Sequence, residues 1–251
     1  MHRNPKLQPN LRPCNGAPAR SRPWRAWSRP PRQQLTPSRL PSLTDSLNRV
    51  AFWLAAHAPR ILSESLNPGA EAAELNALQN AVGQPLPDDY RALYQRHDGL
   101  NDEENAGNFF YGLQFLPLAH VRADFQQRRE AAPYPLAHAG PGIHLANALT
   151  PNWLALAFDG SHGWLRLDLA PAEGGHHGQV IFWDEEYETA FPVAPSVAAL
   201  LATFATDLEA GRYHLHPEAL ADGHEFLQPV RALDMVNWRT AARFRRYAAL
   251  K

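Results

Sequence analysis

The side chains between residues 159 and 177 are those of this chain that most resemble catalytic groups. An Asp-Gly-Ser-His loop occupies residues 159–162, Asp168 follows as a lone acid, and His176 and His177 are adjacent. Serine, histidine and an acid are the groups of nucleophilic catalysis, and histidines with carboxylates are common zinc ligands. The segment therefore raises the question of a hydrolase or a metal site.

The spacing of these residues indicates turns between strands. The sequence FDGSHGW separates two apolar runs, and Asp/Gly-rich connections of this kind are typical of hairpins. It is not a Gly-x-Ser-x-Gly nucleophile elbow, because no helix follows it. Adjacent histidines do not converge on a metal, and no carboxylate or cysteine near His214 and His216 completes a tetrahedral set. No phosphate-binding loop or dinucleotide fingerprint is present. We expect no catalytic residue, no metal, no cofactor and no enzymatic activity.

The remaining pattern predicts the elements that hold these turns. Apolar residues recur at helical spacing from Leu47 to Leu62, a second helix is expected to begin at Asn67 as its cap, and a third covers residues 87–99. Strands are expected at 153–158, 164–169 and 178–186, the second of them half-buried, and a closing helix at 196–211. Helices followed by strands and a helix predict an α+β fold.

Charge is strongly segregated along the chain. Residues 1–41 hold eight Arg, one Lys, nine Pro and no acid, whereas residues 50–215 hold 20 acidic against 8 basic residues, a net charge of −12. The first segment is expected to be disordered. The favoured interpretation is a solvated tail or upstream sequence translated from a misassigned start, and the alternative is a tail that binds nucleic acid or an anionic membrane. The acidic domain favours basic partners and opposes nucleic acid.

Other features of the composition bound the location of the protein. Cys14 is the single cysteine, which excludes an internal disulfide framework. No apolar run approaches the ~18–20 residues of a membrane span. There is no secretion signal near the start of the sequence, so we expect a cytoplasmic protein.

Three stretches resemble one known family. LPDDYRALYQRHDGL is similar to the Leu-Pro-x-x-(Tyr/Phe)…(Asn/Asp)-Gly signature of the SUKH superfamily, the Smi/Knr-like proteins. The stretch from WLALAFDG to GQVIFW and the closing FPVAPSVAALLATFATDLEAGRY resemble later parts of the same pattern. The motif residues, which we expect to be structural, are Leu86, Pro87, Tyr90, Gly99, Trp153, Asp159, Gly160, Asp168, Gly178 and Gln179.

The resemblance implies a single α+β domain over residues 42–217, with N-terminal helices, a mostly antiparallel or mixed sheet and a closing helix. Many bacterial members of this family are immunity proteins that neutralise a cognate toxin, often a nuclease, and fungal relatives act in cell-wall synthesis and signalling. Residues 218–251 lie outside the likeness and carry a charge of +5 from 229 to 251. We expect an amphipathic helix there, which docks on the acidic domain, binds a partner or touches a membrane surface; docking is the favoured interpretation.

Our leading functional hypothesis is a cytoplasmic immunity protein that binds a basic toxin domain. The alternative is a regulatory or scaffold protein in cell-wall assembly and signalling, and an unrecognised hydrolase is the third hypothesis. The sequence does not fix the oligomeric state. The expected partner contacts are loop acids and nearby aromatics: Asp102, Glu103, Glu104, Phe109 and Tyr111, then Asp184, Glu185, Glu186 and Tyr187.

Overall fold

The computed structural model describes residues 41–101, 103–132, 135–146 and 150–249. The chain divides into two units, and everything below concerns the second, residues 39–251. The predicted Arg/Pro-rich tail, apart from Pro41, and the predicted contact residue Asp102 lie outside the described residues. The role of the tail therefore stays a prediction.

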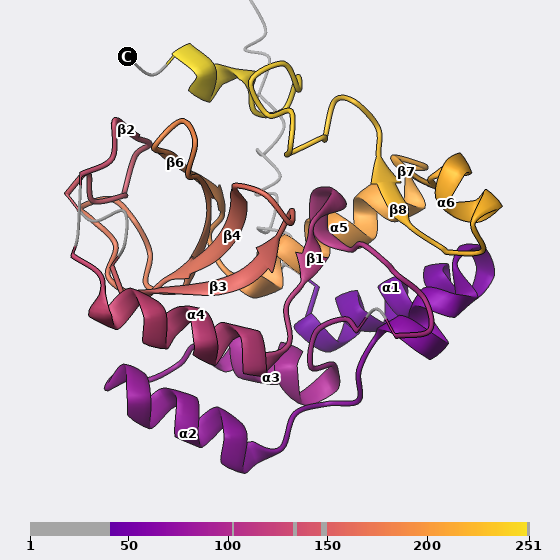
Figure 1. Ribbon diagram of the computed structural model, residues 1–251, viewed down its shortest axis with the longest axis horizontal. Helices are drawn as coiled ribbons and strands as arrows, with labels where there is room; N and C mark the ends of the chain where they lie inside the picture. Colours follow the sequence, from indigo (N-terminus) through magenta and orange to yellow (C-terminus); the bar gives the residue numbers. More distant parts are fainter. Residues whose placement is uncertain (1–40, 102, 133–134, 147–149, 250–251) are drawn as a thin grey trace, which may run out of the picture. The chain divides into compact units, whose positions relative to one another are not determined.

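Helices form the first part of the described chain (Figure 1): α1 (Leu43–His57), a π-helix (Ile61–Ser65), α2 (Ala72–Val82) and α3 (Asp88–Arg96). Local signals explain most of their ends. The Ser42 hydroxyl accepts a hydrogen bond from the Asp45 amide at 3.1 Å, and α2 ends at Gly83, whose φ is +78°. The expected start at Asn67 is wrong, because Glu71 and Glu74 form a capping box and α2 begins at Ala72.

A six-stranded sheet follows the helices. In spatial order it consists of β1 (Gln114–Phe115), β3 (Trp153–Phe158), β4 (Gly163–Asp168), β5 (Gln179–Asp184), β6 (Thr189–Ala194) and β2 (His138–Ala139). All neighbouring strands are antiparallel except β2 and β6, which are parallel. The structure therefore confirms the predicted α+β fold with a mixed sheet. It also contains α4 (Leu118–Glu130), which the sequence pattern did not predict.

Both faces of the sheet are covered. Val180 and Phe182 of β5 belong to the large core beneath α5 (Val197–Glu209), while Ile181 and Trp183 point into a second, smaller apolar cluster. Because side chains alternate along a strand, β5 supplies both layers: its apolar residues 180–183 are buried on both faces, between Gln179 and Asp184 at the strand ends.

A buried arginine occupies the second face of the sheet, where the sequence predicted a solvent-facing strand side. The Arg166 guanidinium is fully buried and makes a bidentate ion pair with Asp124 of α4, at 2.7 and 3.0 Å. Its central carbon lies 4.2 Å from the ring centroid of Trp164 and 5.0 Å from that of Trp183. The half-buried prediction for β4 is thus corrected, since α4 and the indoles cover that side.

The last part of the described chain packs onto the same core. A hairpin of β7 (Tyr213–Leu215) and β8 (Leu227–Pro229) flanks the short α6 (Pro217–Ala221), and a 3₁₀ helix covers Arg245–Ala249. Residues 230–249, called the strap below, run mainly through turns where an amphipathic helix was expected. The physical reason is local, because the Asp234 side chain accepts hydrogen bonds from the Asn237 amide and side chain and stabilises a turn.

Candidate interaction surface

An ion-pair cluster fixes the strap to α5. The Asp207 carboxylate is buried, with 1% exposure, and receives hydrogen bonds from Arg243 at 2.5 and 3.0 Å. Arg212 donates to the same carboxylate at 2.5 Å. Two guanidinium groups thus bind one buried carboxylate. Because Arg243 belongs to the strap, this contact makes the strap part of the domain.

Aromatic side chains extend this attachment across the sheet. The Trp238 indole donates to Asp184 Oδ2 at 2.7 Å. The Tyr247 ring stacks on Phe191 with centroids 4.3 Å apart, and its hydroxyl donates to the Pro192 carbonyl at 3.2 Å. The basic C-terminal segment therefore docks on the acidic domain.

The two hairpin turns at one end of the sheet lie side by side. The Glu185 amide donates to the His162 carbonyl at 2.9 Å. Asp159 Oδ1 accepts from the amides of Ser161 and His162 at 2.7 and 2.9 Å, which closes an Asx turn. His162 Nε2 lies 3.9 Å from Asp184 Oδ2 and 3.7 Å from Glu186 Oε2.

This arrangement resembles a Ser-His-Asp set only in composition. The Ser161 hydroxyl contacts His162 Nδ1 at 2.9 Å, but the 3.9 Å from the imidazole to Asp184 is too long for a hydrogen bond. Asp184 is instead committed to the Trp238 indole and the Tyr187 amide. The Asp-Gly-Ser-His loop therefore acts as a turn. Within the described ranges, no three His, Cys, Asp or Glu side chains are arranged to hold a metal ion.

The family-motif residues have structural contacts. Asp168 and Gln179 pair across β4 and β5, and Nε2 of the Gln179 side chain donates to Asp168 Oδ2 and to the Gly142 carbonyl, both at 2.9 Å. Burial raises the pKa of the Asp168 carboxyl. Gly178 has a φ of +82°, and a Cβ there would lie 2.7 Å from Pro87. These residues clamp two loops together. The other motif side chains Leu86, Tyr90 and Trp153 are buried.

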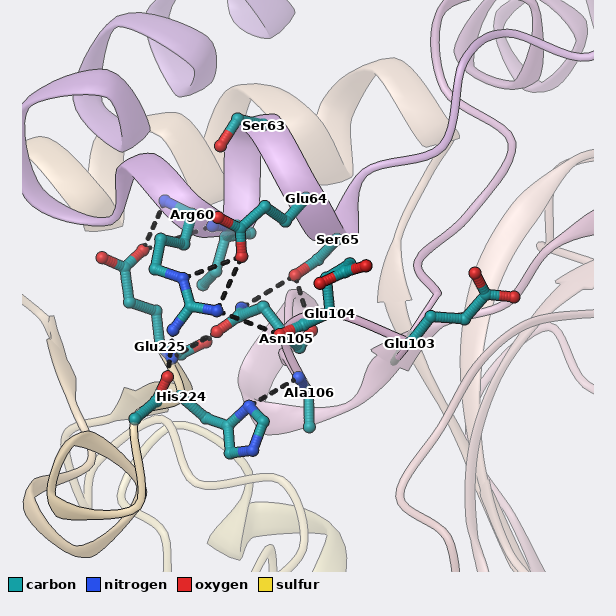
Figure 2. Close-up of polar contacts among 12 residues, drawn as sticks. Arg60, Ser63, Glu64, Ser65, Glu103, Glu104, Asn105, Ala106, His224 and Glu225 are labelled. Carbon is teal, nitrogen blue, oxygen red and sulfur yellow. Dashed lines mark hydrogen bonds and ion pairs between the residues drawn. The ribbon is translucent and has the colours of Figure 1, made fainter.

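The first acidic loop rests on a buried asparagine (Figure 2). Asn105 is fully buried, and its side chain donates to Ser65 Oγ at 2.8 Å and to the Glu225 carbonyl at 3.2 Å. It also accepts from the Glu225 amide at 2.7 Å, and the Ser65 hydroxyl donates to the Asn105 carbonyl at 2.8 Å. The preceding residues Glu103 and Glu104 are exposed. The loop thus presents acids from a fixed base.

An arginine ties the same three segments together. Arg60 donates to the Glu64 carboxylate at 2.8 Å, to the Glu104 carbonyl at 3.0 Å and to the Gly223 carbonyl. The Glu225 carboxylate accepts from the Arg60 amide at 2.7 Å. This junction includes the π-helix, and single-turn π-helices occur frequently at functional sites.

The structure separates the predicted contact residues into exposed and buried groups. Glu103, Glu104, Glu185 and Glu186 are exposed, and Tyr187 is 41% exposed. In contrast, Phe109, Tyr111 and Asp184 are 2%, 3% and 1% exposed, respectively. Phe109 packs on Phe204 and Tyr111 on Phe244, so neither ring faces a partner in this structure.

Two adjoining clefts lie along the strap. One cleft, of about 400 Å³, is lined by His162, Glu186, Tyr187 and residues 236–240. A second, of about 280 Å³, is lined by residues of the 108–112 loop and the β7–β8 hairpin. Both clefts include Val236 and Asn237 in their walls. Sequence reasoning missed these strap residues; the basic charge of the segment was the available signal.

The described residues form an α+β domain that presents exposed acids on loops of fixed geometry, which makes these loops a candidate interaction surface. The chain belongs to the SMI1 / KNR4 family (SUKH-1), whose model matches residues 69–203. The resemblance seen in the sequence is therefore confirmed. None of the helices described here is long and apolar enough to cross a membrane.

Several fungal proteins are similar to this chain. KNR4/SMI1 homolog 2 of Debaryomyces hansenii is 26% identical over 219 residues, which cover 70% of this chain and 37% of that protein. Cell wall assembly regulator SMI1 of Saccharomyces cerevisiae is 25% identical over 204 residues, 66% of this chain and 40% of that protein. A glucan synthesis regulatory protein of Neurospora crassa is 27% identical over 210 residues, 68% and 39% of the two chains. The matched part spans 37–40% of the length of these relatives.

Proposed function

We propose that this protein is a non-enzymatic regulator or scaffold in cell-wall assembly, which acts by binding other proteins. The observation that carries the proposal is membership of a family in which similar proteins are named regulators of cell-wall assembly and glucan synthesis. The exposed acids Glu103 and Glu104, held by buried Asn105, supply a surface for such binding. Acidic loops of fixed geometry attract basic partners and set the orientation of the complex.

Toxin neutralisation is the second candidate function. The net charge of −12 over residues 50–215 suits a basic toxin as well as a basic regulatory partner. The two candidates differ in the number and nature of the partners. A regulator has several partners in wall synthesis or signalling, whereas an immunity protein has one dedicated toxin.

The test is capture of partners by the immobilised full chain from a lysate of the source organism, at low and moderate salt. The variant carries Glu103→Lys with Glu104→Lys. The matched control carries Glu130→Lys with Glu173→Lys, which makes the same change of charge at other exposed acids. We expect wall-synthesis or signalling proteins to bind the native chain and the control but not the variant.

A deletion strain gives the cellular readout, with increased sensitivity to wall-damaging agents expected. Capture of one basic, toxin-like protein in near-stoichiometric amount would replace the regulatory proposal with toxin neutralisation. Capture of no protein by the native chain, together with an unchanged wall in the deletion strain, would overturn both.

A further inference from the structure

We propose that the cleft between the 184–188 turn and the strap binds an arginine side chain from a basic segment of the partner protein. The inference rests on the proposed function, since it names the chemistry of the partner. The cleft has a volume of about 400 Å³, which lies within the usual range for small-ligand pockets. Its lining combines the Tyr187 and Trp238 rings, the Glu186 carboxylate and the His162 imidazole with strap residues that include Val236 and Arg239.

The cleft already holds a guanidinium from its own chain. The central carbon of Arg239 lies 4.4 Å from the ring centroid of Tyr187, a cation–π contact. Arg239 is exposed and Tyr187 is 41% exposed. Contacts of this kind are weak at solvent-exposed positions, so an arginine of a partner can replace Arg239 on the same ring face.

The carboxylates of the turn differ in their availability. Asp184 is engaged by the Trp238 indole at 2.7 Å and the Tyr187 amide at 3.0 Å. Glu186 is exposed and lies in the wall of the cleft. Its Oε2 is 3.7 Å from His162 Nε2. Glu186 is therefore the acceptor that an incoming guanidinium would meet beside the Tyr187 ring.

The turn is held in shape before any ligand binds. Thr189 donates its hydroxyl proton to the Tyr187 carbonyl at 2.8 Å, and Glu188 has a φ of +47°. The Trp238 ring stands nearly perpendicular to the Tyr187 ring, at 83° with centroids 6.3 Å apart, and supports it from below the surface. A preformed aromatic face lowers the entropic cost of binding.

The charges around the cleft select the ligand. Glu185, Glu186 and Glu188 are exposed within one turn and outnumber Arg239 of the lining, so the charge of the turn favours a cationic ligand over an anionic one. Arginine suits the site better than lysine, because its planar guanidinium both stacks on an aromatic ring and forms a fork of hydrogen bonds to a carboxylate.

The test measures binding of a fluorescent Gly-Arg-Gly-Arg-Gly-Arg peptide to the full chain by anisotropy at low salt. Peptides with lysine or neutral citrulline in place of arginine are the ligand controls. We expect the arginine peptide to bind at least tenfold more tightly than the citrulline peptide. Tyr187→Leu, which keeps an apolar side chain without a ring, and Glu186→Gln are each expected to weaken binding about tenfold.

The exchange with the intramolecular arginine has its own matched control. Arg239→Ala frees the Tyr187 ring and should tighten peptide binding severalfold beyond Arg245→Ala, which removes the same charge from another exposed position of the strap. Equal affinity of the two variants would overturn the exchange. Equal binding of the arginine and citrulline peptides, or unchanged binding to folded Tyr187→Leu, would overturn the site.

The two proposals fail in different ways. If partners captured from lysate still bind Tyr187→Leu and are lost only with the Glu103/Glu104 variant, the protein is a binding protein and the arginine site is wrong. If the native chain captures no partner and the deletion strain is unchanged, the proposed function fails whatever the peptide does.

Discussion

Replacing Asp207 with asparagine tests whether the buried ion pair holds the strap. The asparagine keeps the shape of the side chain but removes the negative charge that Arg243 and Arg212 share. Breaking a buried pair by removing one partner typically costs about 3–5 kcal/mol. The Arg243 and Arg212 side chains are 29% and 48% exposed, so water partly hydrates the unpaired guanidinium groups. We therefore expect a loss of about 2–3 kcal/mol in the free energy of unfolding.

The assay is urea unfolding followed by circular dichroism, with thermal melting as a second measure. A loss of about 2–3 kcal/mol corresponds to a fall in Tm of roughly 5–10 °C for a domain of this size. Glu209→Gln is the matched control on the same helix, because its ion pair with Arg49 is exposed. The Arg49 side chain is 31% exposed and the Glu209 side chain 46%. We expect the control to lose less than about 1 kcal/mol.

The comparison can refute the reasoning. If Asp207→Asn costs no more than Glu209→Gln, the ion pair does not hold the strap and apolar contacts alone do so. Salt gives a further distinction, since screening weakens the exposed Arg49 pair more than the buried one.

Three further outcomes follow from the described contacts. Gly99→Ala should prevent folding or lower the free energy of unfolding by more than about 4 kcal/mol, because a Cβ would lie 2.2 Å from the Pro117 nitrogen. Gly83→Ala, whose Cβ would meet no such neighbour within 4 Å, should lose only about 1–2 kcal/mol in urea unfolding. Asn105→Ala should cost about 2–4 kcal/mol and speed hydrogen exchange in residues 103–106; unchanged exchange would show that the loop does not need its buried anchor. Burial lowers the pKa of the His97 imidazole below its ordinary 6.5, so the unfolded chain binds the extra proton first and stability falls as the pH drops below about 6.5. His97→Gln should reduce this loss between about pH 6.5 and the lowered pKa, and an identical pH profile would contradict it.

Much of the fold could be predicted because its signals are local. The closing helix is capped by Ser196, whose hydroxyl accepts from the Ala199 amide, and strand β3 is a continuous apolar run. The cap of α2 was misplaced because Asn67 makes tertiary contacts instead. Its side-chain amide nitrogen donates to the Asp98 carbonyl at 2.8 Å, and its side-chain oxygen accepts from the Asn101 side chain.

The candidate surface could be predicted only in part. Sequence analysis found the acids of both loops, since charged residues in polar connections usually reach water. It also placed Phe109 and Tyr111 on that surface, although both rings are buried. An aromatic residue beside a polar loop is equally compatible with a core and a surface, and only its distant partners decide.

The sequence by itself determined the family, the first helices, the three central strands, the closing helix and the acidic character of the domain, because these depend on residue types and short-range spacing. Tertiary structure alone decided which side chains reach the surface and where the strap lies. Trp238 meets Asp184 across 54 residues of chain, and Arg243 meets Asp207 across 36. Such contacts arise from packing between distant segments, and no local pattern in either segment encodes its partner.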